Sequence, residues 1–219
     1  MIIPHEVLKK RHRKERDTWQ NELSLRIHRA LSWLHRAELS IEQSDEDGRF
    51  IFLWIAFNAA YASEVDEIRE GEEQRYNRFL NRLVALDPTG RMEALIWEKF
   101  SGPIRLLLDN KYVFQAFWDD AGVPDEKSAW EARFNGARKK AHEALATRNT
   151  ERVLALVFSR LYTLRNQLVH GGATCGSQTN RQQLRDGVHL MAEIVPLLLE
   201  IMMDNPDEDW GEVCYPVVT

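Results

Sequence analysis

The chain has 219 residues, of which 44% are hydrophobic and 29% charged, and its net charge is −5. This composition excludes an intrinsically disordered chain, and two cysteines are too few for a disulfide scaffold or a four-ligand zinc site. The acidic balance also disfavours a protein that coats nucleic acid nonspecifically, since that affinity comes from Lys and Arg.

The N-terminal part of the chain carries a basic cluster, residues 9–16, which we interpret as a solvated helix end or arm. No long apolar stretch follows it, so we expect neither a signal peptide nor export. The longest apolar run, over 50–61, is about a dozen residues and too short for the roughly twenty of a membrane span. We therefore expect a cytoplasmic protein with no membrane partner.

Apolar residues recur at helical spacing along most of the chain, and no segment alternates with period two. The first amphipathic helix is predicted to begin after a cap at Asp17 and Thr18. A helix over 50–61 is apolar on every face, which is typical of the centre of a bundle. Further helices are predicted over 76–84, 153–169 and 184–202. The pattern predicts an all-α fold.

The connections between these helices contain turn signals but no Gly/Ser-rich linker, which favours a single domain over residues 1–219. Residues 126–146 have few large apolar side chains, so that helix is expected on the surface or as an insertion. Clusters of Gly, Pro, Asn and Asp predict turns at 45–48, 87–90, 102–103, 121–124, 171–172 and 205–206.

The predicted helix 153–169 carries more apolar surface than one packing partner usually covers. One stripe contains Val157, Leu161, Leu164 and Leu168. An adjacent face, about 100° away around the axis, contains Phe158, Tyr162 and Val169. Either two neighbouring helices or a second subunit covers both faces.

Arg165, Asn166 and His170, at the end of this helix, are the candidate functional residues. Asn166 and His170 are four residues apart and share one side of the last turn, and Gly171 can adopt the left-handed conformation that closes a helix. Histidine moves protons near neutral pH, and arginine holds a phosphate through two parallel hydrogen bonds. These groups suit metal-independent cleavage of RNA by its own 2′-hydroxyl, with Asn166 orienting His170 or the phosphate. We expect no cofactor and no metal.

The same residues also have interpretations that involve no catalysis. Arg165 and His170 are cations of a kind that commonly interacts with the C-terminal end of a helix dipole. An Arg followed by a His at this spacing is expected by chance about twice in this chain. The second occurrence, Arg29 to His35, is followed by Ala30 and has no helix-ending Gly pair, so we interpret it as a surface coincidence.

Other chemistry-bearing residues are assigned structural roles. His28 and His35 are two helical turns apart, too far to share a metal ion without further ligands. Cys175 follows the Gly pair in a predicted loop. Asn58 is interpreted as a buried hydrogen-bonding group, and Tyr162 as a core residue, with base stacking as the alternative for Tyr162.

The run Arg165-Asn166-Gln167-Leu168-Val169-His170-Gly171-Gly172 resembles the R-x(4–6)-H motif of the HEPN superfamily, in which a polar residue, often Asn, follows the Arg. The segments 54–61 and 212–218 are similar to those of uncharacterised bacterial HEPN proteins. The resemblance covers roughly 50–61 and 153 to the C-terminus.

This resemblance implies a HEPN-like helical bundle with additional helices inserted over residues 64–146. It also implies a metal-independent endoribonuclease, commonly a toxin or phage-defence effector, that acts on RNA as a homodimer. Arg165 and His170 would be catalytic at a cleft between two copies, Asn166 would support them, and an antitoxin or other regulatory protein is an implied partner. Two alternatives are a non-catalytic HEPN-like module that binds RNA, a nucleotide or a partner protein, and a purely structural dimer.

Overall fold

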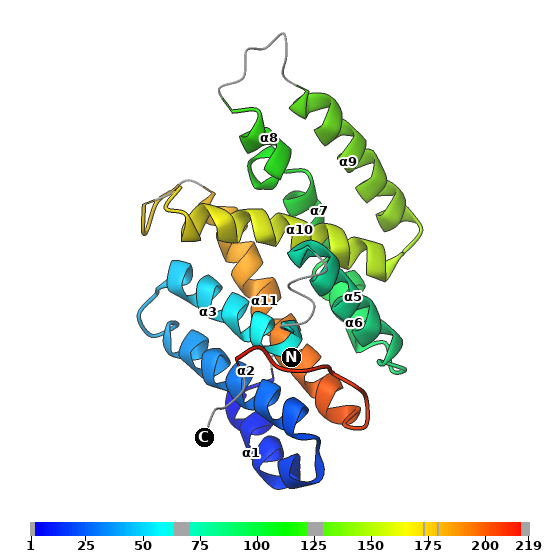
Figure 1. Cartoon of the computed structure of the whole chain (residues 1–219). Coiled ribbons are helices and arrows are strands. Elements are labelled where there is room, and N and C mark those ends of the chain that lie inside the picture. Colours follow the sequence, from blue (N-terminus) through cyan, green and yellow to red (C-terminus); the bar gives the residue numbers. More distant parts are fainter. Residues whose placement is uncertain (1–2, 64–70, 122–128, 173, 179, 216–219) are drawn as a thin grey trace. The chain divides into compact units, whose positions relative to one another are not determined.

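A computed structural model describes residues 3–63, 71–121, 129–172, 174–178 and 180–215. These residues form helices and contain no strand, which confirms the predicted all-α class (Figure 1). None of their helices is long and apolar enough to cross a membrane.

Internal contacts divide the chain into two compact units. Unit 1 consists of residues 1–91 and 187–219, and unit 2 consists of residues 92–186. The single domain and the insertion over 64–146 stay predictions, and parts of that segment lie outside the described residues.

Unit 1 is built on α2, which packs against both α1 and α3 (Figure 1). The helix predicted over 184–202 is present, and it belongs to the core, because its residues Val188, Met191, Ile194, Val195, Leu198 and Met202 are all buried. The helices of unit 1 are α1 (His5–Glu15), α2 (Asn21–Leu39), α3 (Glu46–Tyr61), α5 (Glu72–Ala85) and the part of α11 (Arg181–Asp204) that follows residue 186.

The predicted cap of α2 is wrong. Asp17 and Thr18 lie in a 3₁₀ turn that closes α1, and the Thr18 hydroxyl donates to the carbonyl of Glu15 (2.7 Å). The backbone then extends at Gln20, and α2 begins at Asn21 without a side-chain cap. A hydroxyl near a helix end bonds back to a preceding carbonyl as readily as it caps the next helix, and here the backward bond forms.

The helix predicted over 50–61 is α3, but it is not buried on every face. Trp54 and Phe57 are buried, whereas Phe52 and Ile55 are partly exposed. The Oδ1 atom of Asn58 is buried and accepts no hydrogen bond among the described residues, so the expected bond at that atom is not formed. One side of α3 therefore faces the core of unit 1.

Arg26 of α2 is a buried residue that ties three chain segments of unit 1 together. It is 1% exposed, and its guanidinium donates to the carbonyls of Ala60 (3.2 Å), Ala62 (2.7 Å), Gly211 (3.3 Å) and Glu212 (2.6 Å). A buried charge needs such partners to offset its desolvation. The end of α3 and the segment after α11 are thus anchored to α2.

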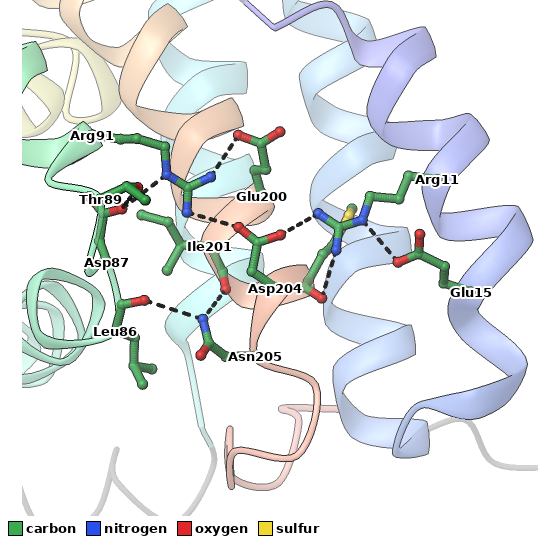
Figure 2. A network of polar contacts seen from close by, with 11 residues as sticks. Arg11, Glu15, Leu86, Asp87, Thr89, Arg91, Glu200, Ile201, Asp204 and Asn205 are labelled. Atoms are coloured by element: carbon green, nitrogen blue, oxygen red, sulfur yellow. Dashed lines mark hydrogen bonds and ion pairs between the residues drawn. The ribbon is translucent and has the colours of Figure 1, made fainter.

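A network of ion pairs connects α1, α11 and the turn after α5 in unit 1 (Figure 2). The two carboxylate oxygens of Asp204 accept hydrogen bonds from Arg11 (2.6 Å) and Arg91 (2.8 Å). Burial alone would lower the pKa of both arginines, but their carboxylate partners raise it above the ordinary value. The other carboxylates are Glu15, beside Arg11, and Asp87 and Glu200, beside Arg91.

Histidines lie at the contact between α1 and α2. His12 is 1% exposed, with its Nε2 atom 3.1 Å from the carbonyl oxygen of Ser24 and its Nδ1 atom buried without a partner among the described residues. Burial, followed by the nearby charge of Lys9, lowers the pKa of His12. Burial is also the largest cause that lowers the pKa of His5 and His28. The neutral form of each ring is favoured by folding.

Acidification is therefore expected to destabilise unit 1. Because the folded-state pKa values of His5, His12 and His28 lie below 6.5, the unfolded chain binds more protons as the pH falls through that value. Their contribution to stability is complete above pH 6.5 and is lost progressively below it. Urea unfolding midpoints between about pH 7.5 and about pH 5.5, above the range of ordinary carboxylates, measure this loss.

The variant His12→Gln is the control for this pH dependence, because its amide can donate to Ser24 but does not titrate. The midpoint of the variant is expected to fall less than that of the unchanged chain over the same pH range. An equal or larger fall would contradict the assignment to His12.

Unit 2 is organised around α10, which packs against α7, α9 and the short 3₁₀ helix η3. The described part of the segment 126–146 is α9, whose residues are mostly exposed, and this confirms it as a surface helix. The elements of unit 2 are α6 (Arg91–Ala94) from residue 92 on, the π-helical turn η2 (Leu95–Lys99), α7 (Ser101–Leu108), η3 (Lys111–Val113), α8 (Gln115–Asp119), α9 (Trp130–Ala146), α10 (Thr150–Val169) and residues 181–186 of α11.

The turn predicted at Gly102 and Pro103 is wrong, because both residues lie in the first turn of α7. Proline is compatible with that position, since the first backbone N–H groups of a helix have no partner within the helix. The Gly-Pro pair therefore marks the start of a helix here, not a break between helices.

Candidate functional site

The helix that carries the candidate residues has a defined start and a defined end. Asn149 caps its start by accepting a hydrogen bond from the backbone N–H of Arg152 (2.8 Å). At its end Gly171 has a φ of +68°, and the N–H of Gly172 donates to the carbonyl of Gln167 (2.8 Å). This is a Schellman closure, and it confirms the predicted left-handed conformation of Gly171.

The apolar faces of α10 are buried along most of the helix and become exposed at its end. Leu161 and Leu164 are buried, as is Phe158 on the adjacent face. Tyr162 is partly exposed, and Val169 is 52% exposed. The second apolar face is thus covered at its start and open beside the candidate residues.

The structure brings Arg165 and Asn166 together. The Nη1 atom of Arg165 donates to the side-chain oxygen of Asn166 (2.9 Å). The guanidinium carbon also lies 5.7 Å from the centre of the Tyr162 ring, within the range of a cation–π interaction. These contacts fix the guanidinium at the partly exposed surface of the last two turns of α10.

His170 is the C-cap residue of α10 and is exposed. Its backbone N–H donates to the carbonyl of Asn166 (3.0 Å), but no hydrogen bond or ion pair of its imidazole is seen within the described residues. The structure therefore places His170 in the same turn as the Arg165–Asn166 pair and does not bond the ring to either residue. An exposed imidazole can exchange protons with a bound substrate.

Gln167 lies within the candidate motif and connects it to residues far away in the sequence. Its side-chain N–H donates to the carbonyl of Tyr112 (2.6 Å), and its side-chain oxygen accepts from Asn180 (3.1 Å). The Trp118 indole N–H donates to the same Tyr112 carbonyl (2.8 Å). The end of α10 is thus bonded to η3 and to the residue before α11, and α8 is bonded to the same carbonyl of η3; the sequence did not predict these contacts.

Two exposed aromatic residues and a lysine lie in the elements that the Gln167–Tyr112 contact joins to α10. Tyr112 is 44% exposed and Trp118 is 41% exposed. The ammonium of Lys111 lies 5.2 Å from the ring centre of Tyr112 and 5.5 Å from that of Trp130. This part of unit 2 therefore offers aromatic surface and positive charge together, a combination typical of sites for single-stranded nucleic acid.

Residues 148–185 contain six arginines and one acidic residue, Glu151, and Arg160 shows that not all of this positive charge lies at the surface. Its side chain is buried, and its guanidinium carbon lies 4.4 Å from the centre of the Phe114 ring. Burial lowers the pKa of Arg160 to about 10. Arg160 is therefore a core cation, whereas Arg165 is available at the surface.

The second Arg-to-His pair, Arg29 and His35, makes contacts that stabilise the fold of unit 1. Arg29 donates to the carbonyls of Cys214 and Tyr215 (both 2.6 Å), and the ring of His35 stacks on that of His5 (4.6 Å). Cys175 is exposed. Within the part of the chain that the structure describes, no group of three or more His, Cys, Asp or Glu side chains is arranged to hold a metal ion.

Among known proteins, no family model, no curated protein and no solved structure matches the chain.

Proposed function

We propose that the protein is a metal-independent endoribonuclease of the HEPN type, with Arg165, Asn166 and His170 as its catalytic residues. The observation that carries the proposal is the surface placement of His170 in the same closing turn as the Arg165–Asn166 pair. A buried His170 would have prevented contact with a substrate. The resemblance of this run to the HEPN motif supplies the reaction class.

The proposed reaction is attack of an RNA 2′-hydroxyl oxygen on the adjacent phosphorus. A new P–O bond forms, the bond to the 5′-oxygen of the next nucleotide breaks, and the products carry a 2′,3′-cyclic phosphate and a 5′-hydroxyl. His170 moves a proton between the reacting oxygens, and Arg165 stabilises the charge that develops on the phosphorane. Asn166, bonded to Arg165, keeps the guanidinium in position.

The chemistry of the products tests this mechanism. We expect the purified protein to cleave RNA in EDTA and to leave cyclic phosphate ends. A matched substrate with 2′-O-methyl groups at the cleaved positions is expected to remain intact, because the nucleophile is blocked. Cleavage of the methylated substrate, or 5′-phosphate products, would exclude the mechanism.

The exposed aromatic residues suggest that the substrate is single-stranded, because unpaired bases can stack on them. We predict that Trp118→Ala weakens binding of single-stranded RNA by about 10-fold, since stacking contributes about 1–3 kcal/mol per base. Fluorescence anisotropy with a labelled oligonucleotide measures this effect.

Trp33→Ala is the matched control for this prediction. Trp33 is 38% exposed, stacks on Phe52 (5.9 Å) and belongs to unit 1. Its replacement is expected to leave RNA affinity unchanged. If Trp118→Ala and Trp33→Ala bind single-stranded RNA with equal affinity, Trp118 does not belong to the RNA-binding surface.

The proposal includes a homodimer in which the motifs of two copies face one cleft. The exposed Val169 beside His170 supplies apolar surface for such a contact. A toxin or defence role, a neutralising protein partner and a cytoplasmic location belong to the same proposal, through the resemblance. Sedimentation of the purified chain measures the oligomeric state.

A non-catalytic RNA-binding module is the second candidate. It is favoured by the pairing of Arg165 with Asn166, since that pair can hold a phosphate without participation of His170. This candidate predicts RNA binding that is unchanged by His170→Ala and no cleavage by any variant.

A further inference from the structure

A pocket of about 280 Å³ in unit 1 is lined by residues of α2, α3 and α11. Leu34, Leu53 and Ala192 supply a buried apolar lining, and Ile41, just after α2, is 54% exposed at the same pocket. An apolar group that enters this space leaves water for contacts with three helices, which is favourable. The pocket is thus suited to a small apolar group.

Two side chains of opposite charge, Glu38 and Arg49, line the same pocket without pairing with each other. Both are partly exposed, and among the described residues no hydrogen bond or ion pair joins them. Neither charge is therefore offset by the other within the pocket. A ligand that carries one positive and one negative group complements both.

The carboxylate of Glu38 is held in position by the start of α1. Its Oε1 atom accepts a hydrogen bond from the backbone N–H of His5 (2.8 Å), one of the N–H groups that a helix leaves without a partner. Burial lowers the pKa of His5, so its ring is mostly neutral at pH 7 and does not offset the carboxylate charge. Glu38 therefore offers a fixed negative charge to an ammonium group.

The guanidinium of Arg49, in the first turns of α3, is available for an anion. No hydrogen bond or ion pair of this group is seen within the described residues. The nearby Asp45 uses its Oδ1 atom to cap α3, by accepting from the backbone N–H of Gly48 (2.8 Å). A guanidinium binds a carboxylate through two parallel hydrogen bonds, so Arg49 can hold the carboxylate of a ligand.

We infer that this pocket binds a free amino acid with an apolar side chain. The ammonium lies at Glu38, the carboxylate at Arg49, and the side chain against the apolar lining. A volume of about 280 Å³ is just below the roughly 300–1,000 Å³ of sites for drug-sized ligands, which fits a ligand of this size. This site goes beyond the proposed nuclease activity and uses none of its residues.

Titration calorimetry of the full chain with L-leucine tests the assignment. Three comparison ligands each lack one feature: L-alanine lacks the larger side chain, 4-methylpentanoate the ammonium, and 3-methylbutylamine the carboxylate. We expect leucine to bind, and each comparison ligand to bind more weakly by about 10-fold, through loss of apolar burial or of a charge-assisted contact. Alanine that binds as tightly as leucine would contradict the role of the apolar lining, and 4-methylpentanoate that does so would contradict the role of Glu38.

Arg49→Gln is expected to weaken the binding of leucine by about 10-fold, because the amide carries no charge. Arg49 is partly exposed and bonds to no described residue, so the variant is expected to fold.

Arg36→Gln is the matched control, because Arg36 is a partly exposed arginine on the adjacent α2 and does not line the pocket. Its guanidinium carbon lies 4.7 Å from the centre of the Phe52 ring. The affinity of this variant for leucine is expected to equal that of the unchanged chain. No binding of leucine, or equal binding by Arg49→Gln and Arg36→Gln, would overturn the assignment.

Discussion

Replacing Arg26 with methionine is expected to lower the free energy of unfolding by about 3–5 kcal/mol. The variant keeps an unbranched apolar side chain but leaves four buried or partly buried carbonyls without their donor. Each carbonyl left unpaired costs about 1–3 kcal/mol, and water that reaches the partly buried carbonyls recovers part of this loss. Urea unfolding followed by circular dichroism measures the difference.

Arg29→Met is the matched control for the Arg26 prediction. Arg29 lies nearly one turn further along α2 and donates to two carbonyls of the same C-terminal segment, those of Cys214 and Tyr215. These bonds are partly exposed to solvent, so the expected loss is about 1 kcal/mol. Equal losses in the two variants would contradict the role that we assign to burial around Arg26.

The largest effect on activity is expected at the candidate site. On the proposed mechanism, His170→Ala lowers the rate of RNA cleavage by about 10²–10⁴-fold, the usual contribution of a positioned acid or base. Arg165→Ala lowers it by about 10²–10³-fold, as for loss of a group that stabilises transition-state charge. Because His170 is exposed, its replacement is expected to change stability by less than about 0.5 kcal/mol. Single-turnover kinetics with labelled RNA measures both rates.

His35→Ala provides the control for these rates. His35 completes the second occurrence of the Arg-to-His spacing and is also exposed, but it lies on α2 of unit 1. Its replacement is expected to leave cleavage unchanged. A rate for His170→Ala equal to that of His35→Ala would show that the cleavage does not depend on the motif.

The helices with strong apolar periodicity were predictable because tertiary burial and local pattern agree in them. The regions 50–61, 76–84 and 184–202 all lie in helices of the structure. The errors fall at helix ends, where one residue type serves two roles. Thr18 bonds back to α1 and does not cap α2, and Pro103 lies in the first turn of α7 and does not separate helices.

The candidate site was predictable only where its geometry is local. The end of α10 at His170 and the conformation of Gly171 follow from spacing and from glycine chemistry within a few residues. The contact between Gln167 and Tyr112 joins residues 55 apart in the sequence, and no periodic pattern indicates it. The burial of Arg160 could not be predicted either, because composition alone does not distinguish a buried arginine from one at the surface.

Incubation of labelled single-stranded RNA in EDTA tests the central claim most directly. The unchanged chain is compared with the Arg165→Ala/His170→Ala double variant and with His35→Ala, all shown to be folded. We expect cleavage by the unchanged chain and by His35→Ala, and none by the double variant. Intact RNA with every protein, or equal cleavage by the double variant, would contradict the assignment of a nuclease site to Arg165, Asn166 and His170.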